Sequence, residues 1–311
     1  MRLDLLAALA GIFVSVQSRV NGELAFQLQN SLEAACISFG SGLVILAMVT
    51  YFHAGIKKGL RDALIAARSG VIPPWHLFGG TLGGLVIAIQ THIVPLIGVA
   101  IYSVSVIAGQ TAISLLVDRL GVTGGGTRHI SARRITAALL TVLAVVISVW
   151  DRLDAKNLSI VAIALGVASG GIIGVQRALN GQVNEHSRQS FATTFLNFAT
   201  GTALLLILFL VGVMTHHSHF SHLNWKPWWM YLGGATGIIY IAFASTVVQH
   251  LGVLTFTLFS VGGQLLGSLV FDIFLPSEGV HVGVYLLTGI CMTYIGVLAN
   301  SERSRSESRP R

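Results

Sequence analysis

Two pairs of side-chain amides stand in otherwise apolar stretches of the sequence. Gln17 and Asn21 are four residues apart, and so are Gln176 and Asn180. This spacing places both members of a pair on one face of a helix. Because an amide both donates and accepts hydrogen bonds, each pair could bind a polar solute or could tie two helices together. The residue types alone leave both functions open.

Two longer polar stripes repeat the same order and spacing. The first comprises Ser103, Gln110, Ser114 and Asp118, and the second comprises Thr257, Gln264, Ser268 and Asp272. In a helix each set forms one continuous stripe, which suits the lining of a transport pathway. The alternative is hydrogen bonding between helices, worth about 0.6 kcal/mol per contact in a membrane. We expect a pathway in which the uncharged members and the two amide pairs bind substrate and the two aspartates stand at its mouths.

Other reactive groups do not form the sets that enzymes or metal sites need. The stretch 215–227 contains four histidines but no carboxylate or thiol, so it favours a polar loop over a metal site. The sequence has no glycine-rich nucleotide loop with its lysine, and it has no recognisable nucleophile and base. We therefore expect no enzymatic activity, no metal and no cofactor.

The composition places these residues in a membrane. Hydrophobic residues make up 53% of the chain and charged residues 10%. The mean hydropathy is +0.77. A soluble domain carries about 25% charged residues, so this chain has too few to cover a surface that faces water.

The amide pairs and the stripes belong to an internal duplication. Residues 11–42 recur at 170–201, an offset of 159 residues, and residues 75–118 recur at 229–272, an offset of 154. Such matches in order are the signature of a repeated unit. We expect a first unit over 1–150, an outer connection at 151–157, a second unit over 158–300 and a disordered basic tail at 301–311.

About 20 apolar residues are needed to cross a bilayer as a helix. Ten segments qualify: 4–22, 31–52, 75–95, 97–117, 131–150, 158–180, 190–214, 228–248, 252–271 and 280–299. With both termini in the cytoplasm, the inner loops and termini hold fourteen Lys and Arg and the outer loops hold three, as the positive-inside rule requires. Because five spans per unit is odd, the second unit enters the membrane upside down. The sequence thus predicts an all-α membrane protein of ten transmembrane helices in two inverted five-helix repeats.

Glycines four residues apart recur in the third and eighth predicted spans. They are Gly79, Gly80, Gly83 and Gly84 in the first unit, and Gly233 and Gly237 in the second. Small residues at this spacing let helix backbones approach closely in lipid. We expect these two spans to lie inside the bundle.

The motifs VQSRVNG with ISFGSG, and GVQRALNG with LNFATG, are similar to those of a known transporter group. The chain resembles the drug/metabolite transporter superfamily and, more narrowly, the YdcZ-like family of bacterial inner-membrane exporters. This resemblance implies a ten-helix bundle with a central cavity lined by the third, fourth, eighth and ninth helices. Small-multidrug relatives in the superfamily use a membrane glutamate in the first span. This chain has Val14, Val16 and Gln17 in that region, which places that coupling mechanism in doubt here.

Two functions therefore compete. The first is a secondary transporter, an exporter of a small organic solute, that works by alternating access between the repeats. The second is a non-transporting membrane scaffold or assembly partner. The expected partners are a small-molecule solute and the lipid bilayer of the bacterial inner membrane, with no nucleic acid. A homodimer is compatible with the sequence.

Overall fold

The structure is a computed structural model. It describes residues 3–120, 132–148, 150, 160–223, 226–241, 253–275 and 282–307. Within these ranges it describes all side chains except those at 114–120, 133–134, 137–138, 141, 178, 253–258 and 297–307.

Every regular element in these ranges is helical. The helices are α1 (Leu3–Leu28), α2 (Ser31–Phe52), α3 (Ala54–Arg68), η1 (Pro74–Phe78), α4 (Gly79–Leu120), α5 (Ala132–Ser148), α6 (Ile160–Ser187), α7 (Ser190–Met214), η3 (Trp228–Leu232), α9 (Val253–Phe274) and α10 (Val284–Glu307). A further helix at 233–241 follows η3. Each of the ten predicted spans contains a helix, so the all-helical prediction is confirmed.

Within the described ranges, five helical stretches are long and apolar enough to cross a membrane by themselves. They are Leu3–Leu28, Ser31–Phe52, Pro74–Ile113, Ile160–Ser187 and Ser190–Met214. Shorter apolar helices occur at Phe259–Phe274 and Val284–Gly296. Helix α1 continues six residues beyond its predicted end because contacts four residues apart, from Arg19 to Glu23 and from Gln27 to Glu23, support another turn.

Helix α4 is two helices joined at a sharp bend. Gly98 has φ 80° and ψ 166°, a conformation that glycine adopts easily and other residues rarely do, and Pro95 lies three residues before it. Gln90 Nε2 lies 3.5 Å from Tyr102 Oη, whereas twelve residues of straight helix would separate the two by about 18 Å. The chain therefore turns back at Gly98, which confirms the predicted break between the third and fourth spans.

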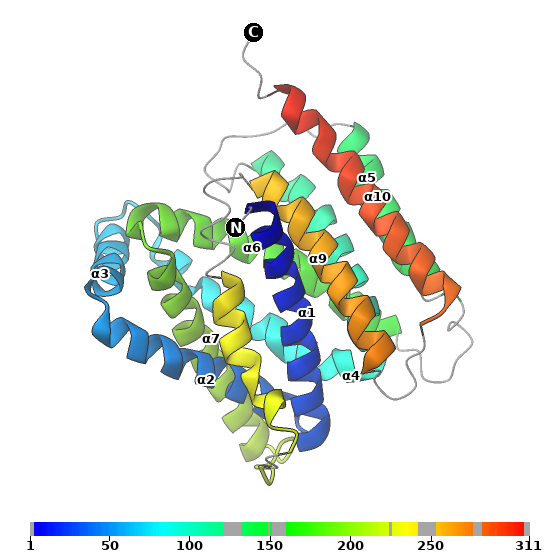
Figure 1. Ribbon diagram of the computed structural model, residues 1–311. Coiled ribbons are helices and arrows are strands. Elements are labelled where there is room, and N and C mark those ends of the chain that lie inside the picture. Colours follow the sequence, from blue (N-terminus) through cyan, green and yellow to red (C-terminus); the bar gives the residue numbers. More distant parts are fainter. Residues whose placement is uncertain are drawn as a thin grey trace.

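Helices distant in the sequence pack in pairs (Figure 1). The orange α9 lies along the dark blue α1, and the red α10 lies along α5 at one side of the molecule. Helix α4 packs mainly against α6. Consequently α1 contacts a helix of the second predicted unit, and α6 contacts one of the first.

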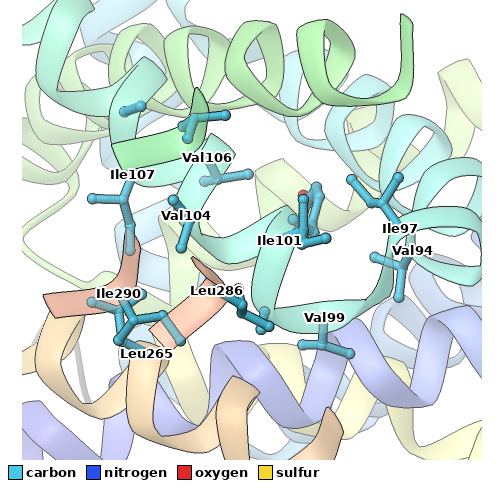
Figure 2. Packing of buried hydrophobic residues seen from close by; sticks show 14 of the residues in the cluster. Val94, Ile97, Val99, Ile101, Val104, Val106, Ile107, Leu265, Leu286 and Ile290 are labelled. Atoms are coloured by element: carbon cyan, nitrogen blue, oxygen red, sulfur yellow. The ribbon is translucent and has the colours of Figure 1, made fainter. Parts of the chain in front are cut away.

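The second half of α4 is the centre of the main hydrophobic core. Every residue from 99 to 109 is buried. Figure 2 shows Leu265 of α9 and Leu286 and Ile290 of α10 close to Val104 and Ile107 of α4. Residues 99–109 of α4 are thus surrounded by protein.

The glycines predicted to permit close packing lie at helix contacts. A methyl group added to Gly80 would lie 2.1 Å from the carbonyl oxygen of Asn197, and one added to Gly234 would lie 2.4 Å from that of Ser38. Additions at Gly83 and Gly237 would strike the amide nitrogens of Gln176 and Gln17. The glycine faces of the third span and of the described part of the eighth, which ends at residue 241, therefore pack against neighbouring helices, as expected.

These contacts are reciprocal between the repeats. A methyl group on Gly11 would meet the carbonyl oxygen of Ser260 at 1.8 Å, and one on Gly170 would meet that of Val106 at 2.0 Å. Gly170 is the equivalent of Gly11 at the offset of 159, and Ser260 is the equivalent of Val106 at the offset of 154. The same contact thus occurs twice with the repeats exchanged.

An aromatic pair joins two further equivalents. Phe39 of α2 and Phe198 of α7 stack with their ring centroids 4.9 Å apart. The ring of Phe198 occupies the space beside Gly42 where a side chain would lie. The ring of Phe39 occupies the same space beside Gly201. The two halves of the sequence therefore meet through equivalent residues of α2 and α7.

Candidate solute-binding site

Asn21 of the first amide pair belongs to a buried hydrogen-bond network between α1 and α4, which we call the first amide cluster. Asn21 Nδ2 donates to Gln90 Oε1 at 2.9 Å, and Gln90 Nε2 donates to Ser18 Oγ at 2.9 Å. The hydroxyl of Tyr102 lies at the edge of this cluster. These four side chains are at most 3% exposed, so the cluster holds the two helices together in this conformation.

The second amide pair forms a different network, the second amide cluster. Gln176 Nε2 donates to Asn197 Oδ1 at 3.0 Å, and Asn197 Nδ2 donates to Asn180 Oδ1 at 3.0 Å. Asn197 lies on α7 and is the equivalent of Ser38 in the first unit. The second amide pair is therefore bridged by a side chain within its own unit.

Gln17 stands apart from the first amide cluster. Its Nε2 donates to the carbonyl oxygen of Gly233 at 3.2 Å, which ties α1 to the start of the helix at 233–241. All four predicted amides thus bind neighbouring helices. Solute binding by them stays a prediction.

The stripe on α9 is enclosed by protein in this conformation. Gln264 is 5% exposed, and Ser268, which is fully buried, donates to the carbonyl oxygen of Leu265 in its own helix. The side-chain nitrogen of Gln264 is buried and has no hydrogen-bond partner among the described residues. Thr257 of this stripe has a side chain outside the described set.

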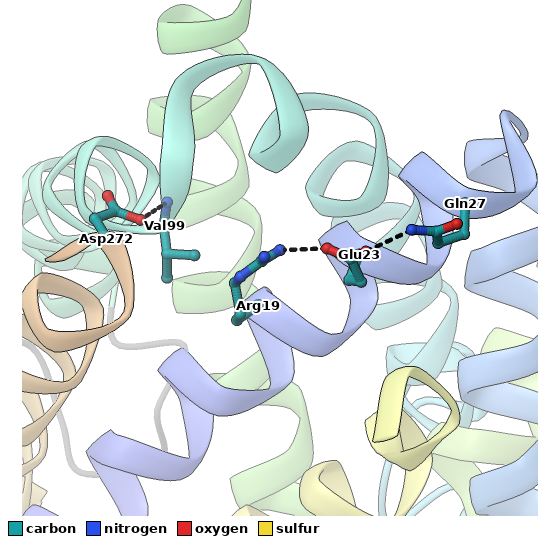
Figure 3. Close-up of polar contacts among 5 residues, drawn as sticks. All are labelled: Arg19, Glu23, Gln27, Val99 and Asp272. Carbon is teal, nitrogen blue, oxygen red and sulfur yellow. Dashed lines mark hydrogen bonds and ion pairs between the residues drawn. The ribbon is translucent and has the colours of Figure 1, made fainter. Parts of the chain in front are cut away.

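Asp272, the last member of that stripe, binds a helix end. Its two carboxylate oxygens accept hydrogen bonds from the backbone N–H groups of Val99 (3.1 Å) and Ala100 (2.8 Å). These donors begin the second half of α4, where a negative charge is favoured by unpaired N–H groups and by the helix dipole. Figure 3 shows the Asp272 side chain directed at Val99. The carboxylate is 3% exposed, so a role as a pathway mouth would require another conformation.

The stripe on α4 becomes partly exposed at Gln110. Ser103 is fully buried, whereas Gln110 is half-buried. The side chains of Ser114 and Asp118 lie outside the described set, so their predicted roles are not addressed by the structure.

Gln110 lies in a polar group that we call the Arg177 cluster. Arg177 Nη1 donates to Gln110 Oε1 at 3.3 Å, and Arg177 Nη2 donates to Tyr240 Oη at 3.1 Å. The three residues come from α4, α6 and the helix at 233–241. The Arg177 side chain is exposed although it projects from an apolar helix. The cluster thus presents polar groups of both predicted units at an accessible position among membrane-spanning helices.

Two arginines were missed by sequence reasoning. The chain contains 19 Lys and Arg, and the count over loops and termini leaves out two of them, Arg19 and Arg177, which lie within predicted spans. A charge within a span is rare and usually has a function, so this signal was available in the sequence. Arg19 is 9% exposed and paired with Glu23 at 3.0 Å, with its guanidinium 5.8 Å from the Trp229 ring centroid. Figure 3 shows that Arg19 pair on α1.

The histidine-rich loop after α7 is fastened to the start of α2. Asn30 Nδ2 donates to Ser218 Oγ at 2.9 Å, and the Glu33 carboxylate accepts from the backbone N–H of Ser221 at 3.0 Å. The four histidine side chains are exposed. Within the part of the chain that the structure describes, no group of three potential metal ligands lies together.

Comparisons with known proteins agree with this architecture. The family model described as "Putative inner membrane exporter, YdcZ" matches residues 3–147 and again 161–299. A solved structure titled "Crystal structure of protein" aligns over 99% of this chain and 98% of its own, with a TM-score of 0.58 and 14% sequence identity. No curated protein matches the sequence. The structural likeness supports the fold alone, and the family match covers two units.

Proposed function

The chain belongs to the YdcZ family of inner membrane exporters, and on this premise we propose that it exports a small organic solute by alternating access. The two units rock about a site between them, as in secondary transporters built from repeats. A scaffold would need no accessible polar group among its spans, so the transporter is the better account.

The reciprocal contacts support an inverted arrangement of the two units. Gly11 with Ser260, and Gly170 with Val106, are the same contact with the repeats exchanged. Such an exchange is expected when an approximate two-fold axis relates the units. Together with the odd number of spans per unit and the fourteen-to-three distribution of basic residues, it favours an axis within the membrane plane.

The observation that carries the proposal is the Arg177 cluster. Its residues come from three helices and from both units, and it joins an exposed cation to a half-buried amide and a phenol. Polar groups in a membrane protein are placed against protein or a water-filled cavity, because lipid does not satisfy them. An accessible set of this kind is suited to bind a solute.

The two stripe glutamines support an assignment of the conformation. On the proposed topology, Gln110 lies on the cytoplasmic side of the bilayer centre and Gln264 on the outer side. Gln110 is half-buried, whereas Gln264 is 5% exposed, and the outer loop is fastened over α2 by Asn30 and Glu33. We propose that this conformation is open to the cytoplasm and closed to the outside.

The topology is tested with single cysteines. In a background in which Cys36 and Cys291 are replaced by serine, His217→Cys should react with a membrane-impermeant maleimide added to intact cells. Ser306→Cys should react only after the cells are opened, because the tail carries basic residues that stay inside. Labelling of the tail in intact cells, with the loop protected, would reverse the proposed orientation.

The transport proposal is tested by flux from liposomes that contain only this protein. Vesicles loaded with a mixture of small organic metabolites should lose at least one of them, as measured by mass spectrometry. Gln110→Leu and Gln264→Leu should each reduce that flux at least about fivefold, since one lost hydrogen bond to a bound solute costs on the order of 1 kcal/mol or more.

The matched control is Gln27→Leu on α1, because Gln27 is exposed and its described contacts are local to its own helix. This variant should transport like the parent. Normal flux in both stripe variants would place the site elsewhere, and absence of flux for every solute tested would favour the scaffold.

A further inference from the structure

We infer that Arg177, with Gln110 and Tyr240, recognises the negatively charged group of a small organic anion. This inference rests on the proposed transport function and names its substrate class. A carboxylate, phosphate or sulfonate on the solute would bind the guanidinium.

The guanidinium has the donors for this task. Arginine carries five N–H donors in a planar fork that matches a carboxylate or phosphate. Its described hydrogen bonds to Gln110 and Tyr240 use one donor on each terminal nitrogen, which leaves donors for a ligand. Those two bonds also hold the fork in a fixed orientation, so less conformational entropy is lost when an anion binds.

Among the described residues, the charge of Arg177 has no carboxylate paired with it. Within the described residues it forms no ion pair, and its two hydrogen-bond partners are neutral. Three of the described acids are engaged elsewhere: Glu23 pairs with Arg19, Glu33 accepts from the outer loop, and Asp272 accepts from α4. Glu185 follows Arg177 by eight residues on α6, which is about 12 Å along the helix axis. Asp118 follows Gln110 by eight residues, which is about 12 Å along the helix axis. An unbalanced cation among spans is costly, and an anionic ligand would offset that cost.

The first unit has no arginine at the position equivalent to Arg177. Its equivalent in the first unit is Ser18, which is fully buried and accepts a hydrogen bond from Gln90. The equivalent of Tyr240 is Val86. The helix contacts common to both units therefore do not require an arginine or a tyrosine at these positions. The Arg177 cluster is thus not explained by the helix packing that the two units share.

The inference is tested by ligand stabilisation of the full-length protein in dodecyl maltoside micelles, which contain no phosphate. Benzoate and phenyl phosphate should raise the Tm, whereas benzyl alcohol and benzylamine at the same concentration should not. Arg177→Gln should weaken the fitted Kd for both anions at least about tenfold. Arg177→Lys, which keeps the charge but loses the fork, should bind with an intermediate Kd.

The matched control is Arg19→Gln, because Arg19 is buried against Glu23 and Trp229 and belongs to no proposed site. It should keep the anion response of the parent, even if its baseline Tm falls. The inference is overturned if neither anion stabilises the parent, if benzylamine stabilises it equally, or if Arg177→Gln responds like the parent. Stabilisation by phosphatidylglycerol but by neither soluble anion would assign the site to a lipid headgroup. That result would overturn the inference that the site recognises a small organic anion.

A second measurement needs no variant. Phenylglyoxal, which modifies arginine, should label the exposed Arg177 of the parent faster than the buried Arg19, as read by mass spectrometry of the peptides. Saturating benzoate should slow labelling of Arg177 severalfold and leave other arginines unchanged. Unchanged labelling of Arg177 would contradict the inference. The proposed transport function would still stand if liposomes release cationic or neutral solutes, so the two failures can be told apart.

Discussion

Replacement of Asp272 by alanine is expected to remove most of the folded protein from the membrane. The substitution leaves the N–H groups of Val99 and Ala100 without their acceptor in a buried position. Each buried donor left unsatisfied costs about 1–3 kcal/mol, so the total is a large part of the stability of a typical domain. The yield of monodisperse protein and its Tm, from fluorescence-detected gel filtration, measure the effect.

Two further variants separate this capping function from a general effect of charge. Asp272→Asn keeps one acceptor oxygen, so its yield and Tm should lie between those of Asp272→Ala and the parent. Asp62→Ala removes a carboxylate from α3, where the structure gives it no capping role. The yield and Tm of this variant should equal those of the parent. A parent-like Tm for Asp272→Ala would show that the bend at Gly98 does not depend on this carboxylate.

The second large effect is expected from adding one methyl group at either reciprocal helix contact. In Gly11→Ala and Gly170→Ala the new carbon would lie 1.8 Å and 2.0 Å from backbone carbonyl oxygens of the neighbouring helix. Backbone cannot move aside as a side chain can, so α1 must shift from α9, and α6 from α4. Overpacking costs about 1–3 kcal/mol even where side chains can adjust, and we expect more than that here.

The matched control is Gly181→Ala, which lies on α6 like Gly170 but has open space around the position of the new carbon. This variant should be neutral or stabilised by up to about 1 kcal/mol, because alanine favours the helix over glycine. Thermal unfolding of the three purified variants measures the difference. Equal Tm values for Gly170→Ala and Gly181→Ala would mean that α4 and α6 do not pack as closely as the structure indicates.

The helices could be predicted from the sequence because their signals are local. Apolar length located ten helices, and the ends of the third and fourth predicted spans, 75–95 and 97–117, placed the break close to Gly98. The end of α1 was predicted too early because Arg19, Glu23 and Gln27 are polar, although their contacts along one helix face extend the helix. Hydropathy measures polarity and does not detect such pairs.

The partners of the polar residues could not be predicted, because they depend on how helices meet. Gln17 and Gln176 are equivalent in the sequence, yet one binds the backbone of Gly233 and the other binds the side chain of Asn197. Asp272 was expected at a pathway mouth, and only the fold reveals that the first turn after Gly98 lies against it. Arg177 was within reach of sequence reasoning, since a charge inside a predicted span is itself the signal.

The difference between Ser18 and Arg177 has an electrical consequence. Two identical units would carry either no arginine or two at these equivalent positions, whereas the diverged halves of this chain carry one. On the proposed mechanism, the empty carrier then bears a single positive charge at the site, and binding of a monovalent anion neutralises it. A charge that crosses the whole membrane field changes in energy by about 2.3 kcal/mol per 100 mV. An inside-negative voltage would therefore draw the empty site toward the cytoplasm and leave the loaded site free to move outward, so the membrane potential itself would favour export.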